Sequence, residues 1–485
     1  MSRVGIAGKL GHYFMESKLT PIIIIAALLL GIFAVMNTPR EEEPQIEVPM
    51  MDIFVMLPGA SAKEVETKVT TPLERKIWEI TGIEYVYSTS MPGMGMLTAR
   101  FYVGEDQERS LVKLYNKLMN NMDMMPPAAM MPLVKHRTID DVPILALTFW
   151  SHEMDHYGLR RVVAEVRDEV KKLNAVSVAD IIGGQPREIR VVLDPARLEA
   201  YHLSPLHIMG MLQKANYELP AGDFQRGNRE FRVEAGDFLA GKEDVADLVV
   251  GIANGMPVYL KNVADITDGP GETDNYVFMG LGPQAEEKGI TDPTQSELEY
   301  PAVTLSIAKR KGADAFQVAN EILAKVEALK GNLLPAEVSV TVTRNYGATA
   351  NEKSNELITH LLGAIAAVLL VVALSMGGRS ALIIFISVPV TFALTLLVYY
   401  LQGFTLNRVT LFALIFVTGI VIDDSIIIAE NIYRHFSMKV LPKMEAAVTA
   451  VNEVGNPTIL ATLTVIASVL PMAFVGGLMG PYMRP

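Results

Sequence analysis

The 485-residue chain is half hydrophobic, has a mean hydropathy of +0.28 and still carries 20% charged residues. Soluble enzymes are seldom so apolar and buried bundles seldom so charged, so the composition favours a membrane protein with a large water-facing part. The net charge of −12 offers no basic surface for nucleic acid, which we exclude as a partner. The lack of cysteine excludes disulfides and cysteine-ligated metal centres.

The first long apolar run extends from Thr20 to Met36. Basic residues precede it at Arg3, Lys9 and Lys18, and no convincing small-residue cleavage site follows it. We therefore expect residues 1–38 to form a cytoplasmic N-terminus and an uncleaved membrane helix. The acidic residues Glu41 to Glu43 are expected to anchor the outer end of this helix rather than to bind a ligand.

Four further apolar runs occupy residues 357–475, and each is long enough to cross about 30 Å of hydrocarbon. They are Leu357–Met376, Ala381–Tyr400, Val409–Tyr433 and Pro457–Val475. Basic residues lie in the second-to-third connection, at Arg379, and fill the fourth-to-fifth connection, at Arg434, His435, Lys439 and Lys443, which predicts that both connections are cytoplasmic. The long stretch after the first helix is then extracytoplasmic. Five crossings lead us to expect that the sequence stops before a sixth helix, with residues 476–485 as a truncated periplasmic end.

The water-facing stretch shows two successive β-α-β-β-α-β patterns, which is the split βαβ arrangement. The first occupies residues 39–134, where a capping box at Ser61 and Glu64 opens a helix. One stripe of that helix is apolar, at Val65, Val69, Leu73 and Ile77. We assign residues 135–178 and 271–335 to the second pattern, 179–270 to an insert and 336–356 to the return to the membrane. The predicted fold class is an α+β membrane protein.

Two adjacent carboxylates, Asp423 and Asp424, lie near the middle of the fourth apolar run. A charge at that depth costs roughly 2.5–3.5 kcal/mol, so the pair should hold at least one proton at neutral pH unless a cation lies nearby. Glu430 and Asn431 follow seven residues later, which extends a polar stripe toward the cytoplasm. The stripe suits a proton path, and the alternative is a structural contact between helices.

The segment Gly419–Asn431, GIVIDDSIIIAEN, resembles the fourth-helix signature of the resistance-nodulation-division (RND) efflux permeases. Similar landmarks lie at Leu57–Ser61, Val69–Glu74 and Pro471–Gly477. The resemblance, to the hydrophobe/amphiphile exporter (AcrB-like) branch, implies a trimeric inner-membrane pump. Its tandem ferredoxin-like porter subdomains and inserted docking subdomain would lie in the periplasm and meet an adaptor protein and an outer-membrane channel.

The same resemblance implies proton antiport through Asp423 and Asp424, with Gly419, Glu430 and Asn431 as candidate relay neighbours. The proton motive force would supply the energy, so no cofactor is expected, and the porter-site contacts with the small amphiphilic substrates remain unassigned. In this family the aspartates act with a lysine on a membrane helix of the second half, which this sequence does not reach.

Several other patterns have simpler explanations than ligand binding. A methionine cluster could bind Cu(I), yet methionine more often fills irregular apolar space, and the doubled aspartate favours organic substrates. The cluster comprises Met119, Met122, Met124, Met125, Met130 and Met131. A surface pair is the simpler explanation of His152 and His156, and a solvated turn that of Asp140 and Asp141. No metal or catalytic site is therefore predicted.

Trp78 and Trp150 are expected to be packed core residues, and no nucleotide-binding motif is present in the required context. The sequence therefore gives no support for an enzyme or for transport driven by ATP hydrolysis. Two alternatives to drug export stay open at this point. One is heavy-metal cation efflux by a member of the same superfamily, and the other is a non-transporting membrane scaffold or protein-export auxiliary.

Overall fold

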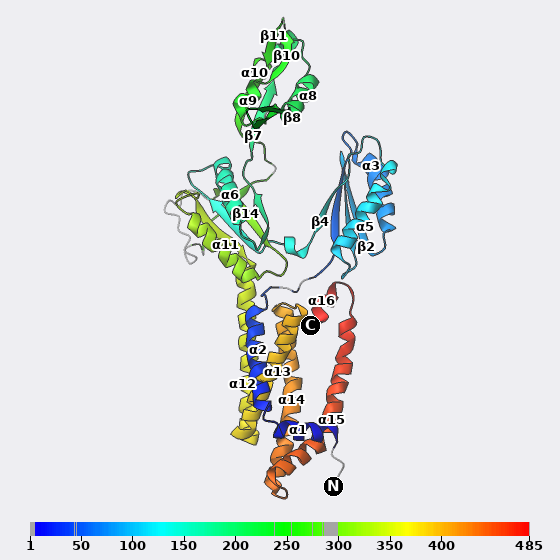
Figure 1. Ribbon diagram of the computed structural model, residues 1–485, viewed down its shortest axis with the longest axis vertical. Helices are drawn as coiled ribbons and strands as arrows, with labels where there is room; N and C mark the ends of the chain where they lie inside the picture. Colours follow the sequence, from blue (N-terminus) through cyan, green and yellow to red (C-terminus); the bar gives the residue numbers. More distant parts are fainter. Residues whose placement is uncertain are drawn as a thin grey trace.

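The computed structural model describes residues 5–42, 44, 46–236, 238–253, 255–273, 275–283, 285 and 299–484, so Arg3 and Glu43 lie outside the described residues. A bundle of long helices forms one end of the molecule. Two α/β subdomains lie above the bundle, and an inserted subdomain extends beyond one of them (Figure 1).

Within the described residues, five helices are long and apolar enough to cross a membrane, as the sequence predicts. They are α2 (Thr20–Asn37), α12 (Tyr346–Met376), α13 (Gly378–Gln402), α14 (Arg408–Met438) and α15 (Lys443–Val469). The prediction that Arg434, His435 and Lys443 lie in the loop between the last two helices was wrong, because α14 and α15 continue as helices beyond their apolar runs. Arg434, His435 and Lys443 therefore belong to helix ends.

An additional helix, α1 (Ile6–Glu16), precedes the first membrane helix and was not predicted. It crosses α15 at a steep angle (Figure 1). Small residues allow this close crossing, because a Cβ atom on Gly455 would lie 2.3 Å from the Cβ of Ala7. The backbone amide of Gly5 also donates to Asn452 Oδ1 at 2.6 Å. These contacts fix α1 against the N-terminal half of α15.

A second close helix crossing joins α2 to α13. A Cβ atom on Gly31 would lie 2.3 Å from the Cβ of Ala393, so only glycine permits this approach. The neighbouring helices α12, α13 and α14 share a buried apolar core that includes Leu361, Ile384 and Leu414. The four helices α2, α12, α13 and α14 thus pack together, whereas α15 contacts mainly α14 and α1.

The first α/β subdomain has four antiparallel strands in the order β2-β3-β1-β4. Its elements are β1 (Met50–Met56), α3 (Ala62–Val65), a π-helical turn (Glu66–Thr70), α4 (Thr71–Trp78), β2 (Ile83–Met91), β3 (Met94–Phe101), α5 (Gln107–Met119) and β4 (Leu133–Arg137). The predicted capping box at Ser61 and Glu64 is present, and the four predicted stripe residues are all buried. The β-α-β-β-α-β order of this subdomain is uninterrupted.

The second α/β subdomain repeats that order with a break in an edge strand. Its elements are β5 (Leu145–Trp150), α6 (His156–Val170), β6 (Val176–Ile182), β13 (Val277–Met279), β14 (Tyr300–Lys309), α11 (Ala315–Leu329) and β15 (Ser339–Asn345). Strands β6 and β13 pair in succession with one edge of β14, at Ile182↔Thr304 and Val277↔Ala302, while β5 pairs with the other edge. The chain therefore leaves the sheet after Ile182 and rejoins it at Val277.

This pairing corrects three predicted boundaries. The boundary at residues 178/179 falls within β6, the boundary at 270/271 precedes the return to the sheet, and the end at 335 omits β15. The insert thus extends over residues 183–276, and the return to the membrane begins at Tyr346. Alternating strands look alike in sequence, so only the observed pairing shows to which sheet each one belongs.

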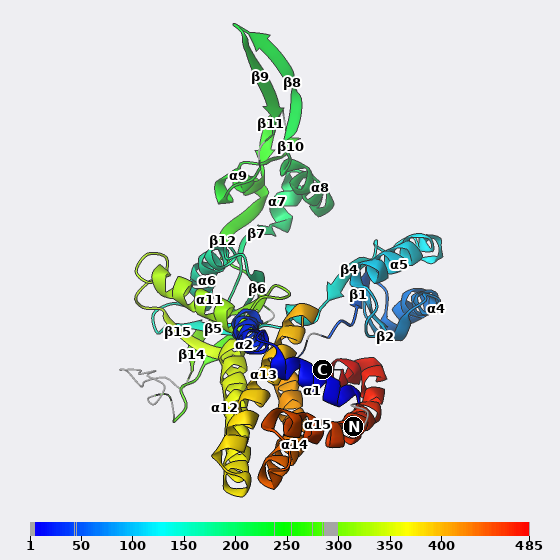
Figure 2. The ribbon, with the colours of Figure 1, turned by 60° about the horizontal axis from the view of Figure 1, so that its bottom comes forward.

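The inserted subdomain is closed at its base by β7 (Arg187–Leu193) and β12 (Ala264–Pro270), which pair with each other and not with the second sheet. Between them lie α7 (Pro195–Ala200), α8 (Pro205–Ala215), β8 (Leu219–Arg226), β9 (Arg229–Ala235), α9 (Lys242–Ala246), β10 (Val249–Ala253), β11 (Met256–Tyr259) and α10 (Leu260–Val263). The β8–β9 hairpin projects far from the rest of the molecule (Figure 2). Its tip region exposes the stacked rings of Phe224 and Phe231.

Candidate functional site

The two predicted site carboxylates lie at the centre of α14, and Asp423 is the middle residue of this 31-residue helix. The helix begins where Asn407 accepts hydrogen bonds from the amides of Val409 and Thr410. It ends at Lys439, whose φ of 53° is left-handed. Asn407 thus satisfies two backbone amides at the start of the helix, and the carboxylates lie about halfway through the apolar span.

Asp424 faces the neighbouring helix α15, because its Oδ2 accepts a hydrogen bond of 2.8 Å from the hydroxyl of Thr462. The next residue, Ser425, lies 3.0 Å from the hydroxyl of Ser387 on α13. Polar contacts thus tie the centre of α14 to two helices. A hydroxyl that donates to a carboxylate inside an apolar span supplies a partner that lipid cannot supply.

Asp423 lies on a different face of α14, and its side chain is exposed. Within the described part of the chain it has no hydrogen bond or ion pair. The candidate neighbours Gly419 and Glu430 are exposed on the same helical stripe, together with Phe412 and Phe416. The structure therefore separates the two aspartates: one contacts α15, and the other is on an open face.

Asn431, the fifth predicted site residue, is buried between α14 and α15. Its amide donates to the carbonyl of Ala450 at 2.8 Å and to Glu453 Oε2 at 3.3 Å. The carboxylate of Glu453 also accepts from Arg434 at 2.8 Å and contacts His435 Nε2 at 2.7 Å. The polar stripe thus continues to the end of the helix hairpin on the side of α15.

Sequence reasoning missed Thr462, Ser387 and Glu453 as partners of this site. Thr462 and Ser387 are each one of several hydroxyl residues in their apolar runs, so the sequence did not distinguish them. Glu453 lies outside the predicted fifth run, and its helical register relative to α14 was not known. No lysine or arginine of the described chain lies within ion-pair distance of either aspartate.

The methionine cluster and the Asp140–Asp141 pair, at which no metal site is predicted, have different surroundings in the structure. The side chains of Met124, Met130 and Met131 are more than two-fifths exposed. Asp141 caps a short helical turn, since its Oδ2 accepts from the amide of Thr138 at 2.8 Å. Among the residues that the structure describes, no three His, Asp or Glu side chains lie close enough to hold a metal ion.

His152 is exposed and His156 is half-buried, and the ring of each lies beside an aromatic ring. The ring of His152 is 4.3 Å from that of Tyr300, and the ring of His156 is 5.0 Å from that of Phe278. Trp150 is buried as predicted, at 3% exposure. The core prediction for Trp78 was wrong: its side chain is 58% exposed, because Ile77 already occupies the inward position at this point of α4.

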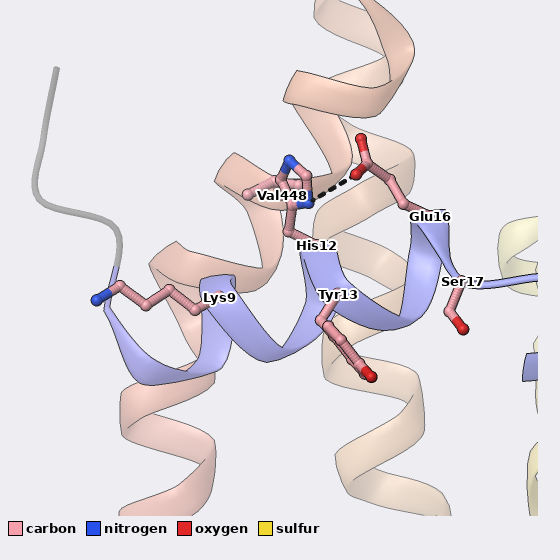
Figure 3. Close-up of a pocket in the computed structure, with 6 residues that line it drawn as sticks. All are labelled: Lys9, His12, Tyr13, Glu16, Ser17 and Val448. Carbon is pink, nitrogen blue, oxygen red and sulfur yellow. Dashed lines mark ion pairs between the residues drawn. The ribbon is translucent and has the colours of Figure 1, made fainter.

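A hollow of about 620 Å³ lies where α1 crosses α15 (Figure 3). It is lined by Lys9, His12, Tyr13, Glu16, Ser17 and Val448. His12 Nδ1 lies 3.5 Å from Glu16 Oε2, and both side chains are more than half exposed. None of the five predicted site residues lines this hollow, so it is separate from the carboxylate pair.

Fold and site together define a membrane protein with five apolar helices among its described residues and with ionisable groups midway along one of them. The chain belongs to the AcrB/AcrD/AcrF family, whose model matches residues 12–485. The predicted resemblance to the RND permeases is thereby confirmed.

Relatives of this chain include proteins named multidrug resistance protein MdtC. Those of Yersinia enterocolitica serotype O:8 / biotype 1B, Yersinia pestis bv. Antiqua (strain Angola) and Yersinia pseudotuberculosis serotype O:1b (strain IP 31758) are each 28% identical over 469 residues. The match covers 96% of this chain and 44% of each relative. The chain thus spans less than half the length of these relatives.

Proposed function

We propose that this chain is part of a secondary active transporter of the bacterial inner membrane, which exports amphiphilic or hydrophobic compounds by proton antiport. The observation that carries the proposal is the carboxylate pair, Asp423 and Asp424, at the centre of a membrane helix. The relatives' name, multidrug resistance protein, supports organic compounds as substrates.

The pair suits proton exchange because two neighbouring carboxylates repel each other when both are ionised in a medium of low dielectric constant. Loading or releasing a proton therefore changes the charge of α14. Thr462 links Asp424 to α15 at 2.8 Å, so this change alters the contact between the two helices. Asn431 and Glu453 continue the polar contacts toward the helix ends and extend the proposed proton path.

The open face of α14 supports a further element of the transporter. Ionisable side chains within membrane spans almost always face protein or water rather than lipid. Asp423 and Glu430 are exposed here, so in the working transporter another membrane helix should cover them. A cation on that helix would complete the relay, as the family resemblance implies.

The distribution of basic residues supports the sidedness of the proposal. Lys18 precedes α2, Arg379 follows the α12–α13 turn, and Lys439 and Lys443 flank the α14–α15 turn. All of these lie at the end of the bundle opposite the α/β subdomains (Figure 1). By the positive-inside rule this distribution supports a cytoplasmic location for that end, and we propose that the α/β subdomains lie in the periplasm as porter subdomains.

We further propose a homotrimer that works with a periplasmic adaptor protein and an outer-membrane channel. The inserted subdomain is the proposed docking part, because it lies farthest from the membrane helices (Figure 2). Its projecting hairpin exposes Phe224, Phe231 and Val233, which suit contact with protein partners.

The test replaces the site residues in the transporter that contains this chain. Asp423→Asn and Asp424→Asn should each reduce efflux of an amphiphilic dye such as ethidium to background at unchanged membrane levels, because neither amide can exchange the proton. Thr462→Val should reduce efflux by about ten- to a hundredfold, since a hydrogen bond to a charged group contributes roughly 1.5–3 kcal/mol.

Thr464→Val is the matched control, because among the described residues the Thr464 hydroxyl donates to the carbonyl of Leu460 in its own helix and to no other helix. Its efflux should equal that of the unchanged transporter. Normal efflux by both aspartate variants would refute proton coupling and would favour a non-transporting scaffold or another energy source.

A further inference from the structure

A buried ion pair lies at the junction between the membrane helices and the second α/β subdomain. Lys309 Nζ lies 2.5 Å from Glu41 Oε1, and the two side chains are only 7% and 4% exposed. By comparison, the side chains of Arg100 and Glu84, which pair in the first subdomain, are 22% and 17% exposed. Charges withdrawn from water so completely persist only when they are paired, so the pair specifies one arrangement of the two segments.

The pair joins two distant parts of the chain. Glu41 follows the end of α2 by four residues, and Lys309 is the last residue of β14. Strand β14 is flanked by β5 on one edge and by β6 and β13 on the other, so it is a central strand of the second sheet. A force on Glu41 is therefore transmitted to the middle of that sheet.

The segment 39–42 is also bound to the start of α14. Leu406, in the α13–α14 connection, donates its amide to the carbonyl of Pro39 at 2.9 Å and accepts from the amide of Glu41 at 3.1 Å. Glu42 Oε1 lies 3.9 Å from Arg408 Nη2, in the first residue of α14. Movement of α14 along its axis would therefore displace segment 39–42.

The same segment is bound to the second subdomain and to α12. The amide of Arg40 donates to Asp314 Oδ2 at 2.8 Å, and its carbonyl accepts from the amide of Ala315 at 3.2 Å, at the beginning of α11. The Arg40 guanidinium donates to Asn351 and, at 3.1 Å, to Asn355 on α12. Segment 39–42 thus has specific contacts on both sides of the junction.

We propose that Glu41 and Lys309 are positioning residues that couple movements of α14 to the second α/β subdomain. This inference rests on the proposed proton exchange at Asp423 and Asp424. A change of charge at the carboxylates shifts α14, the shift reaches segment 39–42 through Leu406 and Arg408, and the buried pair passes it to β14. The pair itself touches neither proton nor substrate.

The test is a cycle of variants in the purified transporter that contains this chain, followed by hydrogen exchange of backbone amides. Asp423→Asn combined with Asp424→Asn fixes the uncharged state of α14. When Glu41 is left unchanged, this double substitution should alter the rate of amide hydrogen exchange several-fold in α14, β14 and α11. With Glu41→Gln, the response in α14 should persist and the response in β14 and α11 should disappear.

Two further variants serve as controls for the Glu41→Gln result. Lys311→Met removes a nearby but exposed pair, between Lys311 and Glu47, and should leave the response in β14 and α11 intact. Exchanging the charges, with Glu41→Lys and Lys309→Glu together, should restore the response if Glu41→Gln alone fails to fold. Loss of the response in this folded double variant would contradict the inference.

The outcomes separate the two proposals. Equal responses of β14 and α11 with Glu41 and with Glu41→Gln would overturn the coupling role and leave proton exchange intact. A response in α14 alone, in the presence of Glu41, would do the same. No response even in α14 would refute the carboxylates as a conformational switch, and the coupling role would fall with it.

Discussion

The two α/β subdomains share a β-α-β-β-α-β order but are joined to the rest of the chain differently. The first is uninterrupted, and an exposed pair, Lys311 with Glu47, links the segment before it to the second subdomain. The second carries the insert, continues from β15 directly into α12 and meets segment 39–42 through the buried Glu41–Lys309 pair. The two subdomains thus share a fold and differ in how they are connected to the membrane helices and to the insert.

The largest difference is expected when the charged partners are removed. Glu41→Gln should destabilise the second subdomain by about 3–5 kcal/mol, because Lys309 is left buried without its counter-charge. Glu84→Gln in the first subdomain should cost about 1 kcal/mol, since Arg100 is partly solvated there. Denaturant-dependent hydrogen exchange of the backbone amides in β14 and in β3 measures the second and the first subdomain separately. Equal costs for the two variants would remove the contrast.

Truncation of the two cores separates stability from connection. Leu97→Ala and Leu305→Ala each remove a fully buried side chain, and each should cost about 2–5 kcal/mol. Only Leu305→Ala should also speed hydrogen exchange in the first turns of α12, because β15 continues into that helix without a loop. Faster exchange in α12 after Leu97→Ala would contradict the proposed difference in connection.

The close crossing of α2 and α13 holds the membrane helix that leads into segment 39–42, and it can be tested in the same way. Gly31→Ala should destabilise this crossing by about 1–3 kcal/mol, because the added Cβ would lie 2.3 Å from that of Ala393. Gly363→Ala in α12 is the matched control, since apart from the adjoining backbone of α12 no atom of the described residues lies within 4 Å of its added Cβ. Thermal unfolding in detergent measures both variants. A Gly31→Ala variant as stable as the control would show that the helices repack freely.

The smallest expected effect concerns acid. Hydrogen bonds from Lys172 and Lys325 lower the pKa of Glu169 from its usual 4.5 to about 2, and this carboxylate links α6 to α11. Because the folded-state pKa is lowered, the stabilisation is present above pH 4.5 and is lost as the pH falls toward 2.

In the first subdomain, hydrogen bonds from Ser61 and Lys68 similarly lower the pKa of Glu64 to about 2. Both partners lie within the helical segment that contains Glu64. Acid should therefore loosen the contact between α6 and α11, whereas protonation of Glu64 affects contacts only within its own helical segment. Hydrogen exchange between pH 4.5 and pH 2 measures the effect. Glu169→Gln should remove the pH dependence in α6 and α11, and its persistence would assign the effect to other groups.

Much of the fold follows from patterns that the sequence displays. The apolar runs predict the five long helices, and the stripe of Val65, Val69, Leu73 and Ile77 predicts the buried face of a helix in the first subdomain. Helix α1 was missed because its apolar residues are few and are interrupted by small and charged ones. The limits of the insert were misplaced because β6 and β7 have similar alternation and differ only in their pairing partners.

The candidate site shows the same division. The adjacent aspartates stand out in an apolar run, so their position at the centre of α14 could be predicted. Their different surroundings could not, because the rotation of α14 against α15 decides that Asp424 meets Thr462 and that Asp423 stays on the open face. The Glu41–Lys309 pair joins residues 268 positions apart in the sequence, and no local sequence pattern predicts it.

Proton counterflow tests the central claim most directly. The transporter that contains this chain would be reconstituted in liposomes with a pH-sensitive dye in the lumen, and an ethidium gradient would be imposed. We expect protons to move opposite to ethidium, and this movement to vanish in the Asp423→Asn and Asp424→Asn variants. Proton counterflow of unchanged size in both variants would contradict the assignment of the proton-exchanging site to this carboxylate pair.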